Sequence, residues 1–261
     1  MTIVRQELRQ GKRSLLIWTG AIAAMLAVCV FLYPEMKGEM DELNDMMASM
    51  GSFTAAFGMD KINFGTLAGY YAVECGNVLG LGGAFFAALC GVGILCKEEK
   101  GKTAEFLFAH PISRRRIVTE KLLAVGLQVT AMNLIIYAVA IGSLVAIGEE
   151  IPWKEVNLMH GAFYILHLEL AGICFGVSAF LRKGSIGVGL GVAIILYFLN
   201  LIANIAEAAS FLKYITPFAY CEGAEIVSSG HLDGGLVAIG IVFGVLGVAA
   251  AYGQYTRKDM Q

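Results

Sequence analysis

The stretch from Arg5 to Tyr33, RQELRQGKRSLLIWTGAIAAMLAVCVFLY, places four basic residues directly before a run that contains no charged side chain. The run, 15–33, is close to the length of about twenty residues that an α-helix needs to cross the hydrocarbon core of a bilayer. The start imitates a signal peptide, but no A-x-A cleavage site follows the run. We therefore expect a retained transmembrane helix here.

Similar apolar runs follow along the rest of the chain. With the first run, they give six predicted spans: 15–33, 70–96, 119–147, 159–181, 185–205 and 234–255. Lipid cannot satisfy free backbone groups, and the alternating pattern of barrel strands is missing from the sequence, so the spans must be helices. The charged content is 15%, far below the roughly 25% of soluble domains. We predict an all-α polytopic membrane protein, a single transmembrane domain over residues 1–261.

Charges between the runs alternate in sign. Fifteen of the nineteen Lys and Arg residues fall in four clusters: Arg5, Arg9, Lys12 and Arg13; Lys97, Lys100, Lys102, Arg114, Arg115, Arg116 and Lys121; Arg182 and Lys183; Arg257 and Lys258. An even number of spans separates each cluster from the next, while most acids fall in the other segments. The positive-inside rule then places both termini in the cytoplasm, and we expect a multi-pass protein of the plasma membrane. The clusters suit anionic lipid, not nucleic acid.

The segments outside the spans have patterns of their own. Residues 1–14 alternate apolar and basic side chains, which predicts a short amphipathic helix on the inner leaflet. Methionines recur at helical spacing from Met36 to Met50, beside acids. Such a stripe is more typical of packing than of copper binding, so we expect no metal site. Residues 206–233 include an apolar stretch too short to span, broken by Pro217, which favours a re-entrant or interfacial element.

The basic segment 97–121 carries the clearest motif. Gly101-Lys102-Thr103 looks like the end of a phosphate-binding loop, but the pattern requires glycine at position 96, which is Cys96. Thr103 can cap a short helix that ends before Pro111, and Ser113 can cap the next one. The short helix would show an apolar patch, which favours a surface for a partner. The alternative is an amphipathic linker that lies on the membrane.

These residues resemble the ABC-2 type permeases. The matching positions are Glu98 or Glu99, Gly101, Thr103, Glu105, Leu107, Pro111, Ser113, Arg114 and Lys121. Lys102 departs from the family pattern, in which glycine and threonine are often adjacent. The resemblance implies a coupling helix that docks on a separate ATP-binding cassette ATPase subunit. Its implied contact residues are Glu98, Glu99, Gly101, Thr103, Glu105, Phe106, Leu107, Pro111, Ser113 and Arg114.

By the same resemblance, the chain is half of a transport pathway. A second copy or a related permease is expected to complete it. The partner ATPase would bind ATP and magnesium, so this chain would need no cofactor and would not itself be an enzyme. Few charges in the spans suit a hydrophobic or amphipathic substrate, such as a peptide, drug or lipid, moved by an exporter.

Polar residues inside the spans are the candidates for a substrate path. Glu169 lies near the middle of the fourth run, where a charge costs about 2.5–3.5 kcal/mol on insertion scales. It either lines the path, near Gln128 and Asn133, or is a protonated carboxyl bonded inside the bundle. Asn200 and Asn204, one turn apart, could bond across a subunit interface.

Two other functional classes remain open. A self-sufficient secondary transporter or channel would require internal repeats and helix breaks in mid-span, for which the sequence gives no convincing signal. An intramembrane enzyme is disfavoured, because the sequence contains no G-x-S-x-G, no H-E-x-x-H and no paired intramembrane aspartates.

Overall fold

The computed structural model describes residues 2–39, 51–101, 112–182 and 185–257. Six long helical stretches dominate this part of the chain, and each is long and apolar enough to cross a membrane. They are α1 (Thr2–Met36), the stretch Leu67–Val92, α8 (Arg114–Ile147), α9 (Trp153–Phe180), α10 (Ile186–Ile205) and α12 (Gly234–Arg257). No strand occurs in the described ranges, so the all-α, six-span prediction is confirmed.

Short helices connect the spans. The second span itself is built from α4 (Leu67–Tyr70), a π-helical turn η3 (Tyr71–Cys75) and α5 (Gly76–Val92). The remaining short elements are η1 (Lys37–Glu39), α3 (Ser52–Ala56), η2 (Met59–Lys61), α6 (Lys97–Lys100), η4 (Glu207–Tyr214), η5 (Ala219–Cys221) and α11 (Gly223–Ser229). The predicted methionine-striped helix falls largely on 40–50, outside the described residues.

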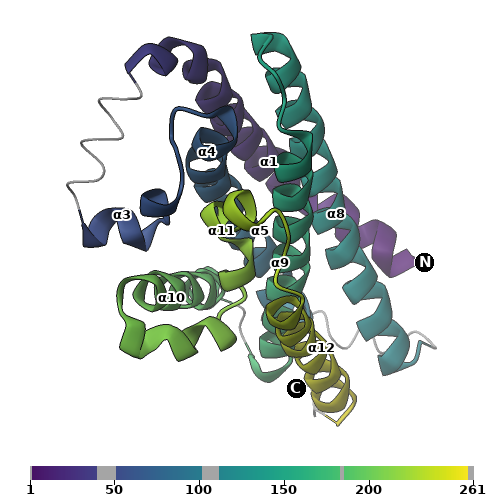
Figure 1. Ribbon diagram of the computed structural model, residues 1–261. Helices are drawn as coiled ribbons and strands as arrows, with labels where there is room; N and C mark the ends of the chain where they lie inside the picture. The colour runs from purple at the N-terminus through teal and green to yellow at the C-terminus, as the bar shows by residue number, and fades with distance from the viewer. Residues whose placement is uncertain (1, 40–50, 102–111, 183–184, 258–261) are drawn as a thin grey trace.

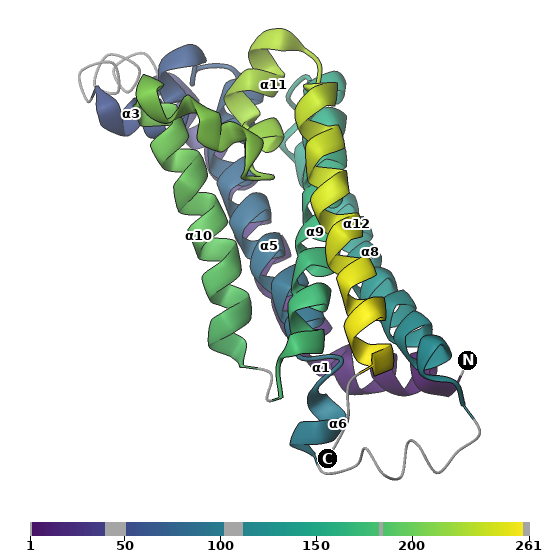
Figure 2. The same ribbon diagram turned by 90° about the horizontal axis from the view of Figure 1, so that it is seen from below.

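The N-terminal segment differs from the prediction in one respect. Residues 1–14 were expected to form a separate amphipathic helix, but α1 continues without interruption from Thr2 to Met36. Its first turns lie across the lower end of the bundle in Figure 2. Ile3 and Val4 are buried there, while Arg5 and Arg9 are exposed. The amphipathic pattern is therefore real, but its apolar side packs on this chain's own helices.

Helix α9 is the centre of the bundle and packs between α5 and α12 (Figures 1 and 2). Glycines allow these close approaches: a Cβ on Gly172 would lie only 2.9 Å from the Gly244 carbonyl oxygen. On the other side of α9, a Cβ on Gly83 would overlap the ring of His167. These glycines thus allow helices of the same chain to pack closely against one another.

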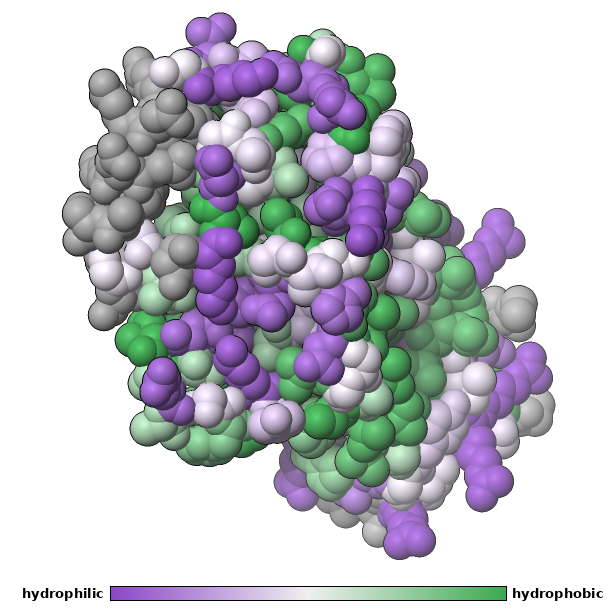
Figure 3. Space-filling view, in the orientation of Figure 1, coloured by the Kyte–Doolittle hydropathy of each residue, from purple (hydrophilic) through white to green (hydrophobic). Residues whose placement is uncertain are grey.

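The two ends of the bundle carry opposite charge. Figure 2 shows both termini and α6 at the lower end. The helices that start or finish there bring Lys97, Arg114, Arg182 and Arg257 with them, and we call this the basic end. The opposite, acidic end holds Glu149, Glu150, Glu155, Glu207 and Asp233. Side chains on the long helices between the ends are mainly apolar, and Figure 3 shows green hydrophobic surface along α12 and hydrophilic residues gathered around α11.

Candidate functional site

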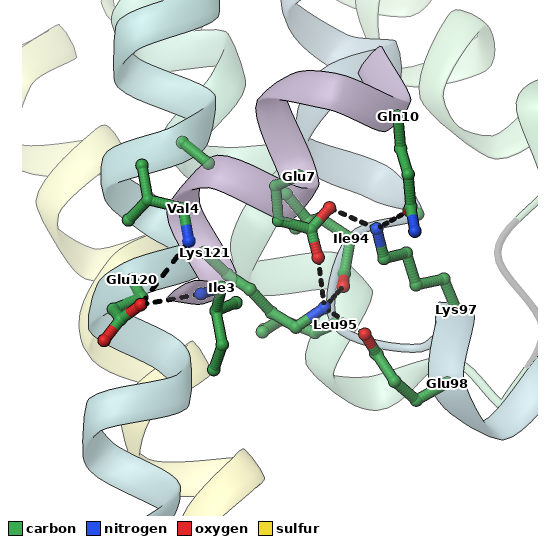
Figure 4. Close-up of polar contacts among 12 residues, drawn as sticks. Ile3, Val4, Glu7, Gln10, Ile94, Leu95, Lys97, Glu98, Glu120 and Lys121 are labelled. Carbon is green, nitrogen blue, oxygen red and sulfur yellow. Dashed lines mark hydrogen bonds and ion pairs between the residues drawn. The ribbon is translucent and has the colours of Figure 1, made fainter. Parts of the chain in front are cut away.

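A buried cluster of charged residues lies at the basic end, and Lys121 of α8 is its centre. The Lys121 side chain is fully buried (0% exposed). Its Nζ donates to Glu7 Oε1 at 3.0 Å, to Glu98 Oε1 at 2.6 Å and to the Ile94 carbonyl at 2.7 Å (Figure 4). The lysine therefore joins three segments: α1, α6 and the turn after α5.

Glu7 is shared between two lysines. Besides Lys121, its carboxylate accepts an ion-pair hydrogen bond from Lys97 Nζ of α6. Lys97 Nζ also donates to Gln10 Oε1 at 2.6 Å. Because Glu7 and Lys121 are both buried, neither charge could be left alone without a large desolvation cost. The group Glu7, Lys97, Glu98 and Lys121, which we call the basic-end cluster, holds α6 against α1 and α8.

A second carboxylate fixes the beginning of α1. Glu120 Oε2 accepts the backbone N–H groups of Ile3 at 3.0 Å and Val4 at 3.4 Å (Figure 4). Arg116 Nε donates to the other oxygen of Glu120 at 3.0 Å. The first N–H groups of a helix have no partner inside it, and the helix dipole favours a negative charge there. Helix α8 thus supplies a carboxylate that caps the first turn of α1.

The other side of the predicted coupling segment is tied to α12. Ser113 caps α8, its Oγ accepting the Arg116 N–H at 3.3 Å. The Arg114 guanidinium donates to the carbonyls of Tyr255 at 3.5 Å and Thr256 at 3.4 Å, near the end of α12. A cation is favourable at a helix C-terminus. The segment between α6 and α8 is therefore held at both of its ends by the transmembrane helices.

The structure accounts for some of the predicted contact residues and not for others. Glu98 and Arg114 bond within this chain, and Gly101 follows the last turn of α6. Thr103, Glu105, Phe106, Leu107 and Pro111 lie outside the described residues. Contact of the segment with a partner therefore stays a prediction.

Sequence reasoning missed Glu7 and Glu120. Glu7 is the single acid among the basic residues of 1–14, and that was the signal that could have revealed it. An isolated acid on the apolar side of a basic helix needs a buried cation as partner. Which cation this is depends on how α1 lies against α8, and no local pattern gives that.

The three residues of the predicted substrate path do not form one site. Glu169 is buried in α9 and faces α12, where a Cβ on Gly240 would overlap its carboxylate. Asn133 Oδ1 instead contacts His167 Nδ1 at 3.0 Å. Gln128 packs against Gly11 of α1, and its Nε2 donates to the Ala124 carbonyl. The three side chains point into three different helix interfaces, so their shared part in a substrate path stays a prediction.

Glu169 has a different neighbour, Tyr220 of η5. Neither carboxylate oxygen of Glu169 makes a well-formed hydrogen bond to any described residue, nor does the Tyr220 hydroxyl. Burial raises the pKa of Tyr220 far above its usual value, and the adjacent Glu169 carboxylate raises it further. The segment 206–221 thus brings a phenol to the one acid in the middle of α9.

These arrangements hold charge in place and offer little to a reaction. In the basic-end cluster, Lys121 donates to two carboxylates, and Lys97 shares Glu7 with it, so no free base faces a free nucleophile there. Within the described ranges, no three His, Cys, Asp or Glu side chains are grouped as metal ligands would be. The ion pairs of this site therefore connect helices to one another at the basic end.

A bundle of six apolar helices with charge sorted between its ends is that of a multi-pass membrane protein. The family model of the ABC-2 family transporter proteins matches residues 1–260. The chain therefore belongs to the ABC-2 family and is a membrane permease of an ABC transporter. No curated protein matches the chain.

Proposed function

We propose that this chain is the permease subunit of an ATP-driven exporter in the plasma membrane, with both termini in the cytoplasm. A separate ATP-binding cassette subunit hydrolyses ATP and docks on segment 97–118. A second permease, identical or related, completes the pathway. The permease moves a hydrophobic or amphipathic substrate and takes no part in the hydrolysis.

The observation that carries this proposal is the way in which segment 97–118 is held. Lys97 and Glu98 connect its start to α1 and α8, and Arg114 connects its end to α12. A force applied to the segment would therefore act on three transmembrane helices together. Rigid-body movement of packed helices is a common response to such a force, and it would open and close the pathway.

An apolar groove supports the class of substrate. It has a volume of about 570 Å³ and lies between α9, α10 and α12, within the range of about 300–1,000 Å³ of small-molecule sites. Its lining includes Ile173, Val177, Ile195, Phe243 and Leu246. Ile173 is one turn from Glu169 on α9, so the groove leads toward the buried carboxyl.

The test is reconstitution with the ATPase subunit. We expect the wild-type permease to copurify with an ATP-binding protein and to show substrate-stimulated ATP hydrolysis in proteoliposomes. Arg114→Glu should uncouple hydrolysis from transport while the protein still inserts, because the end of the segment is no longer tied to α12. Arg182→Glu, which changes an exposed arginine of the basic end outside this segment of the sequence, is the matched control.

Two results would overturn the proposal. One is normal coupling in Arg114→Glu. The other is substrate transport by the purified chain alone, driven by an ion gradient without any ATPase, which would establish the secondary transporter instead.

A further inference from the structure

A second cavity, distinct from the apolar groove, lies between α5, α10 and the residues that follow η5. Its volume is about 50 Å³. A site needs roughly 10–15 Å³ of such space to hold one water molecule, so this cavity has room for a small hydrated ligand. Its polar wall is formed by Asn77 of α5, Tyr197, Asn200 and Asn204 of α10, and Glu222.

Acceptor oxygens of this wall have no donor. Asn200 is 7% exposed, and its Oδ1 accepts no hydrogen bond from the described part of the chain. The same holds for Asn204 Oδ1 and Glu222 Oε1. Buried acceptors without partners lose their hydration without compensation, so they are rare unless a ligand or water satisfies them.

Donors of the same wall are already engaged. Tyr197 donates its hydroxyl to Asn77 Oδ1 at 3.3 Å, and Asn77 Nδ2 donates to the Val73 carbonyl at 2.8 Å. Asn204 Nδ2 donates to the Ala56 carbonyl at 3.3 Å. The cavity therefore presents oxygen atoms to a ligand that donates hydrogen bonds or carries positive charge.

We propose that this cavity binds one small monovalent cation, an ammonium group or an alkali metal ion, through Asn200 Oδ1, Asn204 Oδ1 and Glu222 Oε1. Amide and carboxylate oxygens are the ligands that hard cations prefer. A single carboxylate offsets a single positive charge, which disfavours a divalent ion in so buried a place. The charges of Lys61 and Lys213 both reach Glu222, but no ion pair joins either lysine to Glu222 in the described part of the chain, and Lys61 pairs with Glu225 at 3.7 Å.

The local backbone fits a binding site. The π-helical turn η3 (Tyr71–Cys75) ends at the cavity, with Ala72 and Gly76 in its wall. Such single π-turns inside α-helices occur frequently at functional sites. A Cβ on Gly223 would lie 2.6 Å from the Ala72 carbonyl oxygen, so the loop that carries Glu222 packs directly on this turn.

The experiment uses the full chain in lipid nanodiscs. Thermal unfolding and calorimetric titration are measured with ammonium, methylammonium, sodium and potassium chlorides, each against choline chloride at equal ionic strength. We expect a saturable rise in the unfolding midpoint with at least one small cation. Asn200→Leu should weaken that binding by about tenfold or more, the loss of one hydrogen bond to a charged group.

Further variants keep the test independent of misfolding. Asn200→Asp retains an oxygen and adds charge, so it should bind the cation at least as tightly as the wild type. Asn157→Leu removes an exposed asparagine elsewhere and should leave the titration unchanged. A response to ammonium and methylammonium alone identifies an amine-bearing ligand, whereas a response to sodium or potassium identifies a metal-ion site. Equal behaviour in all salts, or undiminished binding in Asn200→Leu, would overturn the proposal and leave a cavity for water.

Discussion

Glu7 and Glu169 are buried to nearly the same extent, 6% and 4% exposed, but the charged groups around the two carboxylates differ. Glu7 at the basic end lies between Lys97 and Lys121. Glu169 in α9 packs against Gly240 and faces no cation among the described residues. A buried charge with partners stabilises an interface, and a buried acid without them is costly. The ion pairs of Glu7 suit a permanent contact between helices. The surroundings of Glu169 suit a carboxyl that acquires a partner during transport.

Lys121→Met should cause the largest effect. The variant leaves Glu7 and Glu98 buried without their shared cation, and breaking such a pair costs about 3–5 kcal/mol. We expect little folded protein, measured as monodisperse yield and unfolding midpoint in detergent. Lys12→Met, which changes an exposed lysine of α1, should behave as wild type.

The double variant Glu7→Gln with Lys121→Met sharpens this result. Glu7→Gln removes one of the two carboxylates that Lys121→Met leaves without a cation, Glu98 being the other, so the double variant should be more stable than Lys121→Met alone. If the loss of stability in the double variant equals the sum of the losses in the two single variants, Glu7 and Lys121 do not interact. The basic-end cluster would then not hold the helices together.

Gly240→Ala should have the next largest effect. A Cβ at this position would overlap the Glu169 carboxylate, and overpacking typically costs about 1–3 kcal/mol. Gly253→Ala in the same helix meets nothing within 4 Å, and alanine should stabilise the helix by up to about 1 kcal/mol. The two changes should therefore shift the unfolding midpoint in opposite directions. A shift of the same sign in both would show that Glu169 is not pressed against α12.

Glu169→Gln should affect function more than stability. Glutamine keeps the shape and hydrogen-bonding capacity of the side chain but cannot be charged. We expect an unfolding midpoint near that of the wild type and transport reduced roughly tenfold, equivalent to about 1.4 kcal/mol. Transport in proteoliposomes is the measurement, with Glu169→Leu as the comparison. If Gln transports normally and only Leu is unstable, Glu169 is a structural group.

The smallest effect concerns pH. Burial raises the pKa of Glu222 above its ordinary value of 4.5, although Lys61 and Lys213 oppose the shift. Folding then favours the protonated form of Glu222. The contribution of Glu222 to the free energy of unfolding is therefore fully present below pH 4.5 and is lost as the pH rises through its raised pKa. Glu222→Gln should flatten this dependence in unfolding measurements. An unchanged slope in the variant would assign the effect to another group.

The sequence determined the membrane architecture directly. Each run such as 15–33 must form a helix in lipid, because no other structure satisfies its backbone groups there. The sorting of basic and acidic clusters between the two ends also follows from the sequence. An even number of spans separates each basic cluster from the next, so all four clusters must lie at the same end. The start of α8 could be predicted as well, because Ser113 is a local capping signal directly before Arg114, whereas the coupling role of the preceding segment stays a prediction.

Only the tertiary structure decided which buried polar groups meet. Glu7 and Lys121 are 114 residues apart, and Glu169 contacts α12 instead of Gln128 or Asn133. Helices that are apolar on all sides give no sequence signal for their rotation about their own axes, so their facing residues cannot be read from periodicity. Close packing at glycines such as Gly83 and Gly240 fixes that rotation. This packing directs Glu169 toward α12, where it faces no cation in the described part of the chain.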